Sequence, residues 1–151
     1  DRPRHKKIID EAKSLNIEVK LISDGDVSGA LLVTNEKYNI DLFLGTGGGP
    51  EGVLAASALD TYGCGFQGRF IFDTDELKKR ANKMGINDLD KKYKLDEIVK
   101  GDSLFCATGI TKGDLMNGLE LKDNKMIVNT LITHKSQNTK KIIIGEIDIK
   151  K

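Results

Sequence analysis

The sequence predicts an α/β protein with three layers, in which helices cover both faces of a mixed sheet. Two observations predict this class. Segments with helical and with strand patterns alternate through the first two-thirds of the chain, which favours a sheet that is parallel in its first part. Two β-rich segments, 126–133 and 141–149, then flank the polar turn 135–138, which predicts an antiparallel hairpin at the C-terminus. A length of 151 residues suits a single domain over residues 1–151.

The first half of the chain shows two helix–strand alternations. Residues 5–15 form an amphipathic pattern with apolar side chains on one helical face, at Ile8, Ile9, Ala12 and Leu15. A half-buried strand over 17–21 follows and ends at the turn 23–26. The remaining elements predicted in this half are a helix over 27–33, a buried strand over 41–45 and a helix over 50–62. Pro50 suits the first position of that last helix because proline has no N–H to leave unpaired there.

The second half continues the pattern with a strand over 68–72. Thr74 is predicted to cap a helix that buries Leu77, Ala81 and Met84, with Gly85 beyond its end. A short helix over 95–100 and a buried strand over 103–107 complete the alternation. The turn and helix start at 108–114 predict no function.

The charge balance excludes some classes of partner. The chain has 24 Lys and Arg against 23 Asp and Glu, so no global field draws it to nucleic acid or to an anionic membrane. Any phosphate binding must be local. No apolar stretch approaches the roughly 20 residues of a membrane span, and no signal peptide is visible. The two cysteines, Cys64 and Cys106, make no metal-ligand pattern, and they predict a reducing cytoplasm.

The strongest candidate site is the glycine-rich segment 45–52. Glycines let the backbone approach a ligand closely, and the N–H groups at the start of the following helix favour anions. Glu51 falls in the first turn of that helix, where a carboxylate beside phosphate-binding backbone is consistent with a bridging cation. A tight strand-to-helix turn, with Glu51 balancing the helix dipole, explains the same pattern equally well.

Two further clusters lie near the N-terminus. Asp24-Gly25-Asp26 follows the strand 17–21 and could accept hydrogen bonds from sugar hydroxyls or bind a hard cation. Asp-Gly-Asp is also common turn chemistry, in which Asp26 caps the next helix. Arg2-Pro3-Arg4 is predicted to be extended, so that both guanidinium groups could close on one phosphate. A solvated basic terminus is the alternative. His5 and His134 have no partners at metal-ligand spacing, and no role is predicted for either.

These clusters, in this order, resemble the class II fructose-1,6-bisphosphatases, which are metal-dependent sugar phosphatases. The resemblance covers nearly the whole chain and rests on four short motifs in register: Asp1-Arg2-Pro3-Arg4, Asp24-Gly25-Asp26-Val27, Gly47-Gly48-Gly49-Pro50-Glu51-Gly52-Val53 and Ala107-Thr108-Gly109-Ile110-Thr111. It implies hydrolysis of the 1-phosphate of fructose 1,6-bisphosphate to fructose 6-phosphate, a gluconeogenic step, with Mg²⁺ or Mn²⁺.

The resemblance also implies roles for particular residues. Glu51 matches a carboxylate that binds one catalytic metal. The positions that match substrate contacts are Arg2, Pro3, Arg4, Asp24, Gly25, Asp26 and Gly48. Most of the family's metal-binding carboxylates belong to an N-terminal half that this sequence does not contain, and the chain opens at Asp1 without an initiator methionine. We therefore expect this C-terminal half to hold no catalytic residue and to be inactive by itself. Its expected partners are the bisphosphate, the N-terminal half of the same chain and possible identical subunits.

Two other functions remain open from the sequence. Gly47, Gly49 and Gly52 fit the GxGxxG pattern of a dinucleotide-binding oxidoreductase domain, and Asp73 lies about twenty residues further on. Against this, Glu51 would lie unneutralised beside a pyrophosphate. A non-catalytic sugar-phosphate sensor is the second alternative.

Overall fold

The computed structural model describes residues 1–23 and 25–149. The chain begins with a 3₁₀ turn, η1 (Pro3–His5), and α1 (Lys6–Ser14). Helix α2 (Asp26–Leu31) and two further 3₁₀ turns, η2 (Leu32–Thr34) and η3 (Glu36–Tyr38), follow. The central helix is α3 (Gly49–Asp60). The later elements are β1 (Gln67–Gly68), α4 (Asp75–Lys83), β2 (Tyr93–Lys94), α5 (Leu95–Ile98), β3 (Leu104–Thr108), β4 (Glu120–Lys122), β5 (Lys125–His134) and β6 (Thr139–Asp148).

The main sheet is built around β5. Strand β6 pairs with β5 along its whole length, from Lys125 opposite Asp148 to His134 opposite Thr139. The other edge of β5 is shared by β3 and β4, which pair with different parts of it. All these pairings are antiparallel, as is the separate pairing of β1 with β2. The predicted C-terminal hairpin is therefore confirmed.

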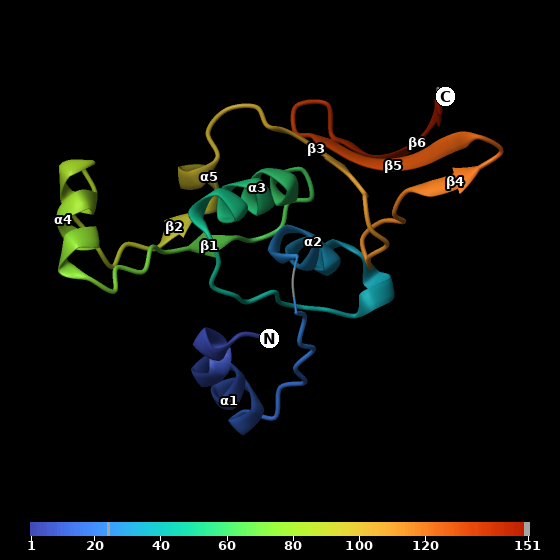
Figure 1. Cartoon of the computed structure of the whole chain (residues 1–151). Helices are drawn as coiled ribbons and strands as arrows, with labels where there is room; N and C mark the ends of the chain where they lie inside the picture. The colour runs from blue at the N-terminus through green and yellow to red at the C-terminus, as the bar shows by residue number, and fades with distance from the viewer. Residues whose placement is uncertain (24, 150–151) are drawn as a thin grey trace.

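The core lies between α2, α3 and one face of this sheet. Leu31 is fully buried in α2, and Leu59 of α3 is 4% exposed. Alternate residues of β5 face these helices, so Leu131 is buried while its neighbours Thr130 and Ile132 are only half-buried. Small side chains let α3 approach closely, and Ala56 and Ala58 are fully buried. Figure 1 shows α2 and α3 beneath the sheet, with α1 and α4 standing away from it.

The α/β class is confirmed, but the predicted parallel part of the sheet is not found. Residues 17–21 and 41–45, both predicted as strands, carry no strand structure. The predicted strand 68–72 is reduced to its first residue, in β1. A strand needs a neighbour that pairs with its backbone N–H and C=O groups, and within the described residues these segments have none.

The predicted three layers are also incomplete. Helices cover one face of the β3–β6 sheet, while apolar side chains on its other face remain exposed in the part of the chain that the structure describes. Leu104 of β3 is 63% exposed and Ile147 of β6 is 54% exposed. Apolar side chains are also exposed at α4. Ala81 is buried as predicted, but Met84, which directly follows the helix and was predicted to be buried, is 69% exposed. No described helix has the length and hydrophobicity of a membrane span.

Candidate functional site

The glycine-rich segment leads into the N-terminus of α3, as the sequence predicts. Gly48 is the N-cap, with extended backbone angles (φ −71°, ψ 150°), and Pro50 lies in the first turn. No side chain caps this end. The first N–H groups of a helix have no partner within it and carry the positive end of its dipole. This end of α3 can therefore attract an anion.

Two carboxylates flank adjacent glycines of this loop. A side-chain carbon built on Gly47 would collide with Oδ2 of Asp26, and one built on Gly48 would collide with Oε2 of Glu51. The absence of side chains at both glycines is what lets the carboxylates lie against the backbone. Carboxylate oxygens are the ligands that Mg²⁺ and Mn²⁺ prefer. The side chains of Asp26 and Glu51 are therefore of the chemical type that binds a hard divalent cation.

The carboxylates of the described residues are too few to hold such a cation alone. No group of three or more His, Cys, Asp or Glu side chains gathers at metal-binding range within residues 1–23 and 25–149. Mg²⁺ usually binds through one or two protein carboxylates together with water and substrate phosphate oxygens. A cation bound here would complete its coordination with such water and phosphate oxygens or with ligands from beyond the described residues.

The N-terminal segment reaches the same loop through Arg4 and His5. The Nε–H of Arg4 donates to the carbonyl oxygen of Thr46 at 2.6 Å. The N–H of Thr46 in turn donates to Nε2 of His5 at 2.9 Å. Two segments some 40 residues apart in the sequence thus meet at Thr46, and Arg4 lies next to the glycine loop.

The predicted geometry of the two arginines is partly wrong. Arg2 is extended (φ −138°, ψ 146°), as Pro3 requires. Arg4, however, belongs to the 3₁₀ turn η1, so the two side chains do not follow the alternation of an extended strand. The proline that extends Arg2 also has a φ suited to starting a helical turn. Arg2 is exposed; its carbonyl oxygen accepts the N–H of His5 at 2.9 Å, and its side chain makes no hydrogen bond or ion pair within the described residues.

Gly25 and Asp26 of the Asp-Gly-Asp cluster begin a helix. Gly25 is the N-cap of α2 and has φ +84°, a conformation that favours glycine. Its carbonyl oxygen accepts hydrogen bonds from the N–H of Gly29 at 2.8 Å and from Oγ of Ser28 at 2.9 Å. This turn directs the half-buried Asp26 toward Gly47. Asp24 lies outside the described residues.

The structure therefore brings Arg4, Asp26, Gly48 and Glu51 together around residues 46–51. The sequence did not predict the contact between His5 and Thr46. Nothing in the residues around either position shows that the Thr46 N–H would donate to the imidazole of His5. Two hollows of the described surface, of 410 and 400 Å³, lie elsewhere: the first is lined by Asn35 and Tyr62, the second by Tyr38 and Asn129. Residues 46–51 line neither of them.

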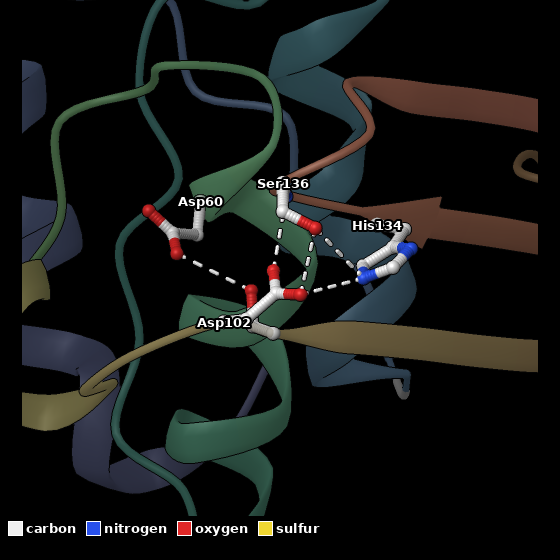
Figure 2. A network of polar contacts seen from close by, with 5 residues as sticks. Asp60, Asp102, His134 and Ser136 are labelled. Atoms are coloured by element: carbon white, nitrogen blue, oxygen red, sulfur yellow. Dashed lines mark hydrogen bonds and ion pairs between the residues drawn. The ribbon is translucent and has the colours of Figure 1, made fainter.

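A second polar cluster, formed by Asp102, His134 and Ser136, joins the start of β3 to the β5–β6 turn (Figure 2). The carboxylate of Asp102 accepts hydrogen bonds from Oγ of Ser136 at 2.7 Å and from its N–H at 2.9 Å, and Oδ2 lies 2.7 Å from Nε2 of His134. Oγ of Ser136 is 3.2 Å from the same nitrogen. In a catalytic triad the imidazole contacts Ser and Asp through opposite ring nitrogens. Here one nitrogen faces both, so the cluster is structural.

A neighbouring contact fastens α3 to the same region. The buried carboxylate of Asp60, at the end of α3, lies 2.9 Å from Nζ of Lys135 and accepts a hydrogen bond from Oγ of Ser103 at 3.2 Å. The N–H of Lys135 also donates to the carbonyl oxygen of Ser103. Together these bonds hold α3 against the sheet, and α3 carries Glu51 at its other end.

The Asp102 cluster predicts a pH dependence of stability. Hydrogen bonds from the Ser136 side chain, then from its backbone N–H and from His134, lower the pKa of Asp102 from 3.8 to about 2. Because the folded-state pKa is lowered, the stabilisation is complete above the unfolded pKa and is lost as pH falls from about 4 through about 2. Between pH 4 and pH 2, Asp102→Asn is expected to show a smaller decline of Tm than the wild type.

Circular dichroism melts at half-unit pH intervals would test this expectation. Ser136→Ala removes the largest cause of the pKa shift and should reproduce part of the Asp102→Asn behaviour. Parallel Tm curves for wild type and Asp102→Asn below pH 4 would contradict it.

With fold and site described, the molecule is an α/β protein whose anion-attracting helix start is flanked by an arginine and two carboxylates. Residues 1–146 match the family described as bacterial fructose-1,6-bisphosphatase, glpX-encoded. The chain belongs to this family.

Curated relatives agree with this assignment. The chain is 38% identical over 156 aligned residues to the D-fructose 1,6-bisphosphatase class 2/sedoheptulose 1,7-bisphosphatase of Trichodesmium erythraeum. It is 36% identical to the protein of the same name from Crocosphaera subtropica and 35% to that from Synechocystis. Each alignment covers 95% of this chain but 45% of the relative. The chain thus spans about half the length of the curated relatives that it matches.

Proposed function

We propose that this chain is the C-terminal half of a cytoplasmic, metal-dependent phosphatase that removes the 1-phosphate of fructose 1,6-bisphosphate. Membership of the family supports the reaction class. The observation that carries the proposal is the convergence of Arg4, Asp26 and Glu51 on the glycine loop at the start of α3. Phosphoester hydrolysis needs positive charge around the phosphate and carboxylates for divalent cations, and this cluster offers both.

The residues of this half would have three roles: binding a phosphate, orienting the sugar and binding a cation. Arg2 and Arg4 would bind a phosphate, because guanidinium groups donate paired hydrogen bonds to its oxygens. Asp24 and Asp26 would orient the sugar through its hydroxyls, and Pro3, Gly25 and Gly48 would shape the backbone around it. Glu51 would be one ligand of a divalent cation, Mg²⁺ or Mn²⁺. When bound, such a cation neutralises phosphoryl oxygens and prepares a water for in-line attack.

The other cation ligands would come from the half of the enzyme that the relatives have in addition. The exposed surface supports this arrangement. A compact protein of 16.6 kDa is expected to expose about 7,600 Å², whereas the chain exposes 11168 Å². The excess, roughly 3,600 Å² on this chain alone, is well above the roughly 800 Å² that each partner buries in an interface of standard size.

Apolar side chains occupy the places where that half would pack. Leu42 and Leu44, on the segment predicted as a strand, are 72% and 61% exposed, while Phe43 between them packs toward α2. We propose that the second half of the same polypeptide covers these side chains and the uncovered face of the β3–β6 sheet. In that complete protein, residues 17–21 and 41–45 would gain strand partners and the third layer would form.

The dinucleotide-binding alternative has lost its structural support. It requires a parallel β-α-β unit around Gly47, Gly49 and Gly52, whereas the strand pairings within the described residues are all antiparallel. The glycines remain explained by the close approach of Asp26 and Glu51.

Phosphate release from fructose 1,6-bisphosphate tests the proposal. The 151-residue chain alone is expected to be inactive with Mg²⁺ or Mn²⁺, and the complete polypeptide active. Sedoheptulose 1,7-bisphosphate should be assayed in parallel, since the relatives' names pair the two sugars. Binding of the bisphosphate by a complete polypeptide that never releases phosphate would support a sugar-phosphate sensor instead.

A further inference from the structure

His5 occupies a position that none of the site roles above explains. It is the half-buried residue next to the exposed Arg4, and its ring reaches across to the glycine loop. Nε2 accepts the N–H of Thr46 at 2.9 Å and lies 3.3 Å from the carbonyl oxygen of the same residue. An imidazole nitrogen that accepts a hydrogen bond carries no proton. In the bond to the Thr46 N–H, Nε2 is therefore the acceptor.

His5 and Arg4 together fix two consecutive peptide planes. The N–H of Thr46 belongs to the plane shared with Gly45, and it is held by His5. The carbonyl of Thr46 belongs to the plane shared with Gly47, and it is held by Arg4 at 2.6 Å. Because the C=O and N–H of a trans peptide point in opposite directions, this second bond also sets the direction of the Gly47 N–H.

The three glycines that follow Thr46 have no side chains of their own with which to hold the conformation of the loop. Residues 47–49 are all glycine, and glycine loses more conformational freedom on ordering than any other residue. The carboxylates of Asp26 and Glu51 lie against Gly47 and Gly48, so an unfixed loop would also displace the groups proposed to orient the sugar and bind the cation. The hydrogen bonds at Thr46 restrain the backbone immediately before the three glycines.

We propose that His5 is a positioning residue: its imidazole accepts the Thr46 N–H and holds the glycine loop in the conformation that receives the phosphate. The expected effect of His5 on KM rests on the proposed function. The hydrogen bond between His5 and Thr46 does not.

The test uses the complete polypeptide with His5→Gln and His5→Leu. Glutamine offers an amide oxygen near the position of Nε2 and keeps the acceptor, whereas leucine fills similar space without one. His5→Leu is expected to raise KM for fructose 1,6-bisphosphate about 3- to 10-fold, the loss typical of one hydrogen bond, with kcat changed less than about twofold. His5→Gln should stay within about twofold of the wild type in both constants.

His134→Gln is the matched control, because the chain has two histidines and His134 belongs to the Asp102 cluster. It should leave KM unchanged. An unchanged KM in His5→Leu would overturn the proposal. So would an equal rise of KM in His5→Gln and His5→Leu, because the hydrogen-bond acceptor of glutamine would then give no advantage over the hydrocarbon side chain of leucine.

A second measurement separates this inference from the proposed function. Amide hydrogen exchange on the same variants should show faster exchange at Thr46 in His5→Leu than in His5→Gln. If the complete polypeptide releases no phosphate but this difference is found, the proposed function fails and the role of His5 stands. Equal exchange at Thr46 in the wild type and His5→Leu would refute the role of His5 whatever the enzyme's activity.

Discussion

Replacing Glu51 by glutamine in the complete enzyme is expected to lower kcat about 100-fold or more, while KM for the bisphosphate changes only a few-fold. The substitution keeps the shape of the side chain against Gly48 but removes the charge that a divalent cation binds. Loss of outer partners of a metal ligand already costs 10- to 100-fold, so loss of a direct ligand should cost at least the upper figure. Steady-state phosphate release over a range of Mg²⁺ and Mn²⁺ concentrations would measure it.

Glu76 provides the control for this experiment. Like Glu51, it lies in the first turn of a helix, here α4, and is exposed. If Glu51 only balanced the dipole of α3, Glu51→Gln and Glu76→Gln would each cost a similar 0.3–1 kcal/mol of stability, and neither would alter turnover. Wild-type kcat in Glu51→Gln would remove the proposed metal role.

Arg4→Ala is expected to raise KM by roughly 10- to 100-fold with a smaller effect on kcat. The change removes a charge-assisted contact to the phosphate, worth about 1.5–3 kcal/mol. It also frees the Thr46 carbonyl, which Arg4 holds through Nε. The guanidinium has further N–H groups that remain available for a phosphate while Nε is engaged, so one side chain can serve both contacts.

Arg4→Lys separates these two contributions. Lysine keeps the positive charge, but its single ammonium cannot reproduce the fork that spans a carbonyl and a phosphate, so its KM should lie between those of wild type and Arg4→Ala. Arg80, exposed in the last turn of α4, is the control, and Arg80→Ala should leave KM unchanged. A normal KM for Arg4→Ala would contradict phosphate binding by this residue.

Local sequence signals predicted several elements well. Thr74 accepts the Leu77 N–H at 3.3 Å as the N-cap of α4, and Gly85 beyond that helix has φ +84°. The C-terminal hairpin was predicted from two β-rich runs that pair with each other across a short turn. Such features depend on neighbours close in the sequence, and the chain contains both partners.

Predictions that needed distant partners were less successful. In the segment 41–45, Phe43 packs toward α2 while Leu42 and Leu44 are exposed, whereas in the segment 17–21 both Ile17 and Leu21 are exposed. A periodic pattern shows which side chains suit burial, but it does not supply the neighbouring strand. The same limit applies to Met84, which fits the apolar face of α4 and yet is exposed.

The α/β class, the glycine loop before α3 and the motifs that resemble the phosphatase family could be predicted without the structure, because each depends on a short run of residues. Only the tertiary structure decided that Arg4 and His5 hold the two sides of Thr46, and that Asp26 and Glu51 lie against adjacent glycines. Those contacts join residues some 20 to 40 positions apart through backbone groups. Every residue type carries such groups, and they leave no signature in the sequence.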